Sequence, residues 1–198
     1  FQLLRNGEYF KAWCQAEQTE IAIKFLLKNF PDDKNLVEGI RQHIQKLQQL
    51  YPYRLFTSTV IVVKQAKCSI CGQKLLLRHN CEHKIGKVYN GEMCCKIITD
   101  CELKGADIVS NPEHKYTVLF TTNEKGEQID HYNYSGIQEL MKLWITPFQN
   151  WDYKVTISYM PKQKAYNDDE FCPCGSALFY KDCCKDKPGI KHRRFVIG

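Results

Sequence analysis

The sequence contains no long hydrophobic run. Its longest charge-free apolar stretch is Leu55–Val63. A membrane-spanning helix needs about 20 apolar residues, so this stretch is too short to cross a bilayer. The chain also lacks a basic segment followed by an apolar one, which is the pattern of a secretory signal. We therefore expect a soluble, cytoplasmic protein with no membrane partner.

Several catalytic motifs are missing as well. The chain has no glycine-rich phosphate loop and no His-Glu-x-x-His metalloprotease motif. The Pro-Cys-x-x-Cys half of a zinc deaminase signature fails after Cys174, because no second cysteine follows at the required position. His79, Cys81 and His83 superficially resemble a His/Asn nuclease cluster, but two of them are better used as metal ligands. We predict no catalytic residues, and a nuclease-like enzyme with an unidentified site stays a distant alternative.

The chain has few methionines and tryptophans, three of each, but it has 11 cysteines. An odd number of cysteines cannot all pair in disulfides. Cys94–Cys95 and Cys183–Cys184 are adjacent, and a bridge between such close neighbours would constrain little of the chain. Close-set thiols with Gly and His nearby, in a chain without a secretion signal, indicate metal sites in a reducing compartment. We expect Zn²⁺, two ions per chain.

Composition also excludes intrinsic disorder. Apolar residues make up 43% of the 198 residues, which is enough to offset the entropy of ordering the chain. This length allows one globular domain with a small satellite. The net charge of +6 is compatible with an acidic partner without requiring one.

Periodicity predicts an α+β fold. Ile21–Phe30 and Leu36–Leu50 have apolar residues at helical spacing, with Pro31–Asp33 between them and an Asp placed to cap the second helix. A third helix is expected from Met93, with Cys94, Ile97, Ile98 and Cys101 on one face. A fourth is expected from Ser135, which begins a Ser-x-x-Gln capping box. Segments 54–64, 115–122 and 153–159 are rich in β-branched and aromatic residues, which favours strands.

These segments suggest a body and an appendage. We expect N-terminal helices, a small and mostly antiparallel sheet with an embedded zinc knuckle, and a short C-terminal zinc module. Residues 1–160 would form the body, with a central Cys/His zinc site within 67–95. Residues 161–170 are polar and begin after Met160 with a proline, so we interpret them as a linker, and residues 171–198 as the module.

The C-terminal cysteines give the most specific signal. Cys172 and Cys174 are separated by one residue, and Gly175 lets the backbone turn back tightly behind them. Eight residues then lead to Cys183 and Cys184, enough for one short turn or helix that returns the second pair. Four thiolates can close a tetrahedron around Zn²⁺ and leave no open position, so we expect a structural site and not a catalytic one.

The stretch FCPCGSALFYKDCC resembles the SEC-C motif, a zinc-binding tail first known from the protein translocase SecA. Cys172, Cys174, Ser176, Cys183 and Cys184 match that pattern, whereas residues 177–179 (Ala-Leu-Phe) replace the basic residues usual after the serine. The resemblance covers about thirty residues. It implies a zinc ion held by the four cysteines and a docking role, since the SecA tail docks a chaperone and can contact the ribosome.

A second metal site is predicted near the middle of the chain. Cys68-Ser-Ile-Cys71-Gly72 is typical of a zinc knuckle, and Cys81 and His83 follow nine residues later. We rank Cys68, Cys71, Cys81 and His83 as the ligands, with Cys94 as the chief substitute and His79 as another competitor. Core packing beside Ile97 and Ile98 is the preferred interpretation of Cys94 and Cys101. The segment 81–94 is also loosely similar to a zinc module of phage and mobile-element proteins, which implies no activity.

The C-terminal module predicts the function. Residues 181–194 contain six Lys and Arg against two Asp, and aromatic residues lie nearby. We expect a zinc-binding interaction protein whose module docks a protein or ribosomal partner. The alternative is a nucleic-acid-binding protein that uses the same basic, aromatic surface on RNA or DNA. The residues expected to contact a partner are Phe179, Tyr180, Lys181, Lys191, Arg193 and Arg194.

Overall fold

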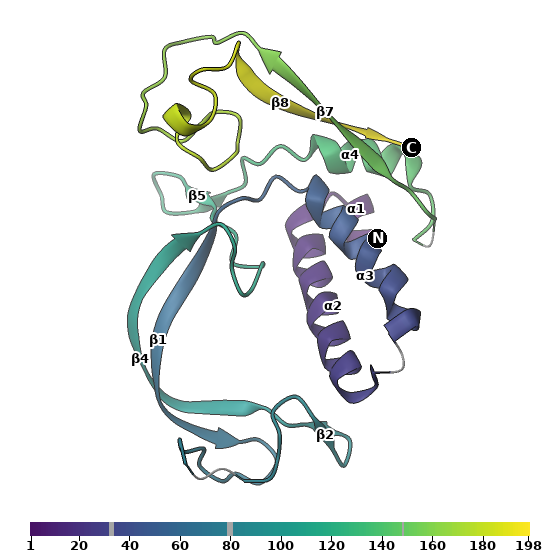
Figure 1. Ribbon diagram of the computed structural model, residues 1–198, viewed down its shortest axis with the longest axis vertical. Helices are drawn as coiled ribbons and strands as arrows, with labels where there is room; N and C mark the ends of the chain where they lie inside the picture. The colour runs from purple at the N-terminus through teal and green to yellow at the C-terminus, as the bar shows by residue number, and fades with distance from the viewer. Residues whose placement is uncertain (32–33, 79–80, 148) are drawn as a thin grey trace.

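The α+β class is confirmed in a computed structural model, which describes residues 1–31, 34–78, 81–147 and 149–198 (Figure 1). Its helices are α1 (Gln2–Arg5), α2 (Tyr9–Asn29), α3 (Lys34–Leu50), α4 (Ser135–Leu143) and the short 3-10 helix η2 (Tyr180–Asp182). The strands are β1 (Phe56–Cys68), β2 (Val88–Tyr89), β3 (Glu92–Met93), β4 (Lys96–Val109), β5 (Thr121–Thr122), β6 (Gln128–Ile129), β7 (Tyr153–Met160) and β8 (Ile190–Ile197). Within these residues the strands form four separate antiparallel pairs: β1–β4, β2–β3, β5–β6 and β7–β8.

Helices α2 and α3 form the predicted N-terminal pair and run in opposite directions (Figure 1). Helix α2 starts well before the predicted segment and buries Trp13, Ala16 and Ile23 on one side. Its end at Asn29 precedes Pro31, which cannot continue the helix. The aspartate expected to cap α3 lies outside the described residues.

The long ribbon of β1 and β4 corrects the helix expected from Met93. Residues 97–99 are consecutive β-branched residues, which favour a strand. Ile97 and Ile98 pair with the end of β1, within the register that runs from Ala66↔Ile98 to Cys68↔Lys96. Ile97 and Ile98 are exposed to similar degrees, 41% and 43%. The two isoleucines therefore do not form the buried face of a helix that their spacing suggested. The ribbon bows away from the helices between its two ends (Figure 1).

Two other expectations are corrected. Of the strand predicted over 115–122, only β5 is regular. The residues before β5 make only isolated contacts with β1, such as the bridge between Val118 and Phe56. The chain turns there, and the Thr117 hydroxyl donates a hydrogen bond to the His114 carbonyl. Helix α4 is present, but Ser135 is its first residue and not its cap. The N-cap is Tyr134, without a side-chain cap bond, and Asn133 Oδ1 accepts the Ser135 N–H instead.

Strand β7 has a partner that local patterning did not predict. It pairs along its whole length with β8, from Tyr153↔Ile197 to Met160↔Ile190. The residues between them, 161–189, form an excursion from this hairpin that carries the C-terminal cysteines (Figure 1). The chain therefore returns from the predicted module to the strand that precedes it, and the role of 161–170 as a linker stays a prediction.

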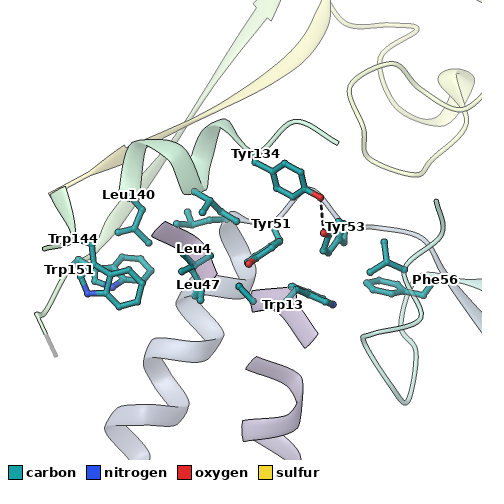
Figure 2. Close-up of a cluster of buried hydrophobic side chains, with 14 residues drawn as sticks. Leu4, Trp13, Leu47, Tyr51, Tyr53, Phe56, Tyr134, Leu140, Trp144 and Trp151 are labelled. Carbon is teal, nitrogen blue, oxygen red and sulfur yellow. Dashed lines mark hydrogen bonds between the residues drawn. The ribbon is translucent and has the colours of Figure 1, made fainter. Parts of the chain in front are cut away.

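An aromatic core joins these parts (Figure 2). Trp13 of α2, Tyr51 and Tyr53 after α3, and Tyr134 before α4 are all buried in one cluster. The Tyr53 hydroxyl donates to the Tyr134 hydroxyl over 2.8 Å, and Tyr134 donates to Asp130 over 2.5 Å. Desolvation raises the pKa of Tyr53 and of Tyr134, which keeps both phenols protonated as donors. The hydroxyls of Tyr53 and Tyr134 are therefore satisfied, whereas the buried indole nitrogens of Trp144 and Trp151 have no hydrogen-bond partner among the described residues.

The chain exposes much more surface than a compact protein of its mass. Its accessible surface is 13958 Å², whereas a compact monomer of 23.2 kDa has about 9,700 Å². Much of the excess is apolar, including Val60 and Leu103 on the β1–β4 ribbon and Ile157 on β7. No helix in the described part of the chain has both the length and the hydropathy needed to cross a membrane.

Candidate metal centres

The C-terminal cluster brings the four predicted cysteines together around one point. The ligand atoms of Cys172, Cys174, Cys183 and Cys184 all lie within 4.8 Å of one another. Two sulfurs bound to one tetrahedral Zn²⁺ at about 2.3 Å are separated by about 3.8 Å. The observed separations are 3.4 Å between Cys174 and Cys183 and 3.8 Å between Cys183 and Cys184. The thiols are thus spaced as ligands of one tetrahedral metal ion.

Local turns set this geometry. Gly175, at φ +73°, closes a turn by donating its N–H to the carbonyl of Cys172 over 3.1 Å. The short helix η2 then presents the second pair, and the N–H groups of Cys183 and Cys184 both reach the carbonyl of Tyr180 at 3.2 Å. The four side chains are therefore held by backbone hydrogen bonds within a span of thirteen residues.

Groups around the cluster favour thiolate. The Ser176 hydroxyl lies 3.2 Å from the Cys183 sulfur, and the N–H of Lys191 donates to the Cys184 sulfur over 3.3 Å. Burial raises the pKa of the Cys174 thiol, but hydrogen bonds from Ser176 and the neighbouring thiols outweigh it and lower the pKa to about 7. Burial raises the pKa of Cys172 strongly. The pKa of one thiol is thus lowered towards neutral pH, whereas burial raises the pKa of Cys172 and of Cys183.

Residues of the predicted linker pack onto this cluster. Tyr166 contacts Tyr180, with ring centroids 5.3 Å apart. Asp168 and Asp169 form ion pairs with Lys185 and Lys181, at 2.5 Å and 2.6 Å. These contacts join residues 166–169 to the module, and the polar composition of this stretch did not indicate them.

The central cluster also unites its four predicted residues. Cys68, Cys71, Cys81 and His83 each offer a ligand atom, and these atoms all lie within 4.8 Å of one another. Cys68 ends β1, and the chain turns beneath it as Gly72, at φ +71°, donates its N–H to the Cys68 carbonyl over 2.9 Å. The Nδ1 atom of His83 is buried and has no hydrogen-bond partner among the described residues. A buried, unpartnered nitrogen on an imidazole that offers a ligand atom to this thiol cluster fits a metal ligand.

This cluster is fastened to the far end of helix α2. Asn29, the last residue of the helix, donates to the Gly86 carbonyl over 2.8 Å and accepts the Val88 N–H over 3.1 Å. The Lys28 ammonium donates to the carbonyl of Ile85. Helix α2 therefore links the aromatic core at one end of the β1–β4 ribbon to the metal cluster at the other (Figure 1).

The competing ligands occupy different positions. Cys94 is 1% exposed, and its sulfur lies 3.7 Å from that of Cys68, a separation that also fits two ligands of one tetrahedral ion, so Cys94 stays the substitute ligand. Burial raises the pKa of Cys94 to about 11, whereas hydrogen bonds, first from the Cys71 backbone, lower the pKa of Cys68 to about 6. Cys101 is exposed on β4, which corrects its expected burial in the core. His79 lies outside the described residues.

The predicted partner-contact residues occupy different positions. Arg193 and Arg194 are exposed on β8, and Lys191 is half-buried. Phe179 is 42% exposed, with the Lys181 ammonium 5.6 Å from its ring centroid. Tyr180 is only 6% exposed and forms the interior of the module, so its ring faces the cluster and not the solvent.

Two exposed residues beside Phe179 were missed. Phe171 stacks on Phe179 with ring centroids 5.5 Å apart and planes 10° apart, and Leu178 lies next to them in the chain. Phe171 is 57% exposed and Leu178 52%. We call Phe171, Leu178 and Phe179 the apolar ridge. The sequence did contain a sign of this ridge. Residues 177–179 depart from the SEC-C pattern, because they are apolar where that family has basic residues.

Comparison with known proteins adds no relative. No protein-family model, curated protein or solved structure matches the chain. The structure itself shows an α+β chain with one cluster of three cysteines and a histidine and one cluster of four cysteines, and each cluster could hold a metal ion.

Proposed function

We propose that the chain is a zinc-binding interaction protein whose C-terminal module docks a protein partner. The observation that carries the proposal is the arrangement of that module. Four cysteines converge on one point, which leaves no open coordination position for a substrate, while the apolar ridge and the side chains of Arg193 and Arg194 on β8 are exposed.

Zinc is the metal that this donor set favours. Thiolate ligands in a tetrahedral array select Zn²⁺ or an iron–sulfur centre among common metals. The bound ion would fix the fold of the excursion between β7 and β8, because metal-binding energy in such small sites is folding energy. The cysteines and Ser176 are also the residues of the SEC-C resemblance, and the contact between Ser176 and the Cys183 sulfur gives that serine a supporting role.

A protein partner is favoured over a nucleic acid by the apolar ridge. Exposed apolar patches on a folded protein are typical of interaction sites. The basic residues of β8 would add charge complementarity, which steers association more than it raises affinity. A ribosomal protein surface has the same chemistry and belongs to this proposal.

The first test is metal content. Elemental analysis of the purified chain should give two zinc ions, because two independent four-ligand clusters are present. A chelator should release both ions and loosen residues 161–189, as read by proteolysis. A count of zero zinc, with all eleven cysteines alkylated in the native protein, would reject the proposal.

The second test is partner capture. Proteins that co-purify with the tagged chain would be identified, and each would be retested with the purified triple variant Lys191→Glu, Arg193→Glu, Arg194→Glu. A second triple charge reversal, at exposed lysines elsewhere in the chain, is the matched control: Lys24, Lys74 and Lys125.

The two candidate partner classes separate by salt. A protein bound through the apolar ridge should stay bound at moderate salt and lose affinity in the first triple variant only. If single-stranded RNA binds instead, and its affinity falls about tenfold or more between low and physiological salt, nucleic acid is the partner class.

A further inference from the structure

Strand β8 has an edge that is not paired with any described strand. Its sheet contains only β7 and β8. Asp152 and Gly198 exchange two backbone hydrogen bonds, of 2.9 Å and 3.1 Å, just beyond the ends of the two strands. Such doubly bonded pairs recur at every second residue of an antiparallel ladder. In this register Arg194 and Val196 therefore direct their backbone groups to β7, whereas Arg193, Phe195 and Ile197 direct theirs to the open edge.

Two contacts agree with that assignment. The Thr156 hydroxyl of β7 donates to the carbonyl of Arg194, so this carbonyl faces β7. The N–H of Lys191 donates to Cys184, which lies on the side away from β7. No hydrogen bond joins the outward N–H and C=O groups of Arg193, Phe195 and Ile197 to another described residue.

A groove runs along the same edge. It has a volume of about 600 Å³ and is lined by residues 192–197 of β8, by helix α4 and by the turn before it, without any residue of β7. On α4 the lining residues Gly136, Glu139 and Leu143 form one stripe at helical spacing. Strand β8 and α4 approach closely because position 136 has no side chain. A Cβ there would be 2.9 Å from the Phe195 ring. We call this feature the α4–β8 groove.

The charge in the groove is mostly positive. Arg193 and Arg194 are exposed and form no ion pair within the described residues, and His192 lies beside them. The only acidic lining residue is Glu139, whose carboxylate is already paired with Lys142 at 2.5 Å. The edge therefore offers unpaired backbone groups next to unpaired guanidinium groups.

We propose that the α4–β8 groove binds an extended, acidic segment of the partner protein, which adds to β8 as a third strand. This inference rests on the proposed function, because it names the chemistry of the partner. Strand addition derives affinity from main-chain hydrogen bonds and specificity from alternate side chains. Here the main chain would bond to Arg193, Phe195 and Ile197, and carboxylates would lie opposite the guanidinium groups of Arg193 and Arg194.

Charge argues against a second copy of the chain as the occupant. Antiparallel pairing of β8 with itself would bring the basic stretch 191–194 of two chains onto one short sheet. Like charges on neighbouring strands destabilise the pairing. An acidic segment has no such penalty.

The test uses the whole 198-residue chain in its metal-loaded form and a synthetic probe. The probe is an eight-residue peptide of two Glu-Glu-Val-Val repeats, blocked at both ends, because Arg193 and Arg194 project from opposite faces of β8 and this order puts carboxylates on both faces of the added strand. Binding is followed by amide hydrogen exchange in NMR spectra. The peptide should slow exchange at least tenfold at Arg193, Phe195 and Ile197. Exchange at Arg194 and Val196 should change little, because these amides already bond to β7.

Three controls isolate the interactions. The same peptide methylated on every backbone nitrogen should lose binding at least tenfold, because it keeps its charge but has no main-chain donors on either edge. The same peptide with Lys in place of Glu should not bind. The double variant Arg193→Glu, Arg194→Glu should weaken binding of the probe about tenfold, whereas Lys24→Glu, Lys125→Glu should change it less than twofold.

Several outcomes would overturn the inference. These are no binding of the probe, binding that leaves exchange at Arg193, Phe195 and Ile197 unchanged, equal binding of the methylated peptide, and a free chain that is dimeric with these three amides already protected. If the probe fails while an identified protein partner still requires the apolar ridge, as judged by Phe171→Ser with Phe179→Ser, the inference alone is wrong. If no protein partner depends on the module, the proposed function is wrong too.

Discussion

The packing of β8 on α4 depends on Gly136, and replacing it with alanine tests that dependence. A Cβ at this position would lie 2.9 Å from Cδ2 of Phe195 and 3.2 Å from the Leu50 carbonyl oxygen. Contacts this short force the ring or the end of α3 to move. Overpacking of this kind costs about 1–3 kcal/mol.

Helix propensity acts in the opposite direction. Alanine in place of a helical glycine stabilises the folded state by about 0.5–1 kcal/mol. The steric cost is larger, so Gly136→Ala should lower the free energy of unfolding by about 1–2 kcal/mol. For a chain of this length, that corresponds to a fall in Tm of about 2–8 °C.

A matched control shows whether the clash is the cause. Gly39 also lies within a helix, α3, but a Cβ there would have no neighbour within 4 Å. Gly39→Ala should therefore raise the free energy of unfolding by about 0.5–1 kcal/mol. Both variants would be compared with the parent by denaturant unfolding followed by circular dichroism. The reasoning is refuted if Gly136→Ala is as stable as Gly39→Ala.

Four more predictions concern the candidate metal clusters and the core. Cys71→Ser and Cys174→Ser should each lower the zinc count from two to one, whereas Cys101→Ser, at an exposed cysteine outside both clusters, should leave it at two by elemental analysis. Cys71→Ser should lower the Tm of the whole chain, because its cluster ties β1 to α2. Cys174→Ser should mainly make residues 161–189 sensitive to protease. An identical loss of Tm in both variants would contradict this prediction. Asn29→Ala should lower the free energy of unfolding, measured with denaturant, by about 1 kcal/mol, because it removes the two hydrogen bonds to Gly86 and Val88. Tyr134→Phe should cost about 1–3 kcal/mol in the same assay by leaving the buried Tyr53 hydroxyl without its acceptor, and an unchanged midpoint would contradict it.

The candidate metal clusters were largely predictable because their ligands are close in sequence. Cys172, Cys174, Cys183 and Cys184 lie within one short turn-and-helix segment, so their spacing nearly fixes their geometry. The central cluster was harder, since Cys94 competes for a place beside Cys68. Spacing ranked the candidates there, but only the fold placed the Cys94 sulfur next to the others.

Local sequence also determined the two long N-terminal helices, where apolar residues repeat with the period of a helix and Pro31 follows the end of the first. The same test failed from Met93. Cys94, Ile97, Ile98 and Cys101 have helical spacing, but the chain there is a strand paired with β1, a segment about thirty residues earlier. Pairing across that distance satisfies the backbone hydrogen bonds of β4, and no local pattern reports it.

Short-range spacing and side-chain chemistry were enough to predict the fold class, the ligand types and the cysteine clusters. Which surface the module presents depended on contacts between distant segments. It buried Tyr180, left Phe171 exposed, and returned residues 190–197 to pair with β7. That return created the α4–β8 groove, since the open edge of β8 and the glycine of α4 meet only when segments fifty residues apart pack together.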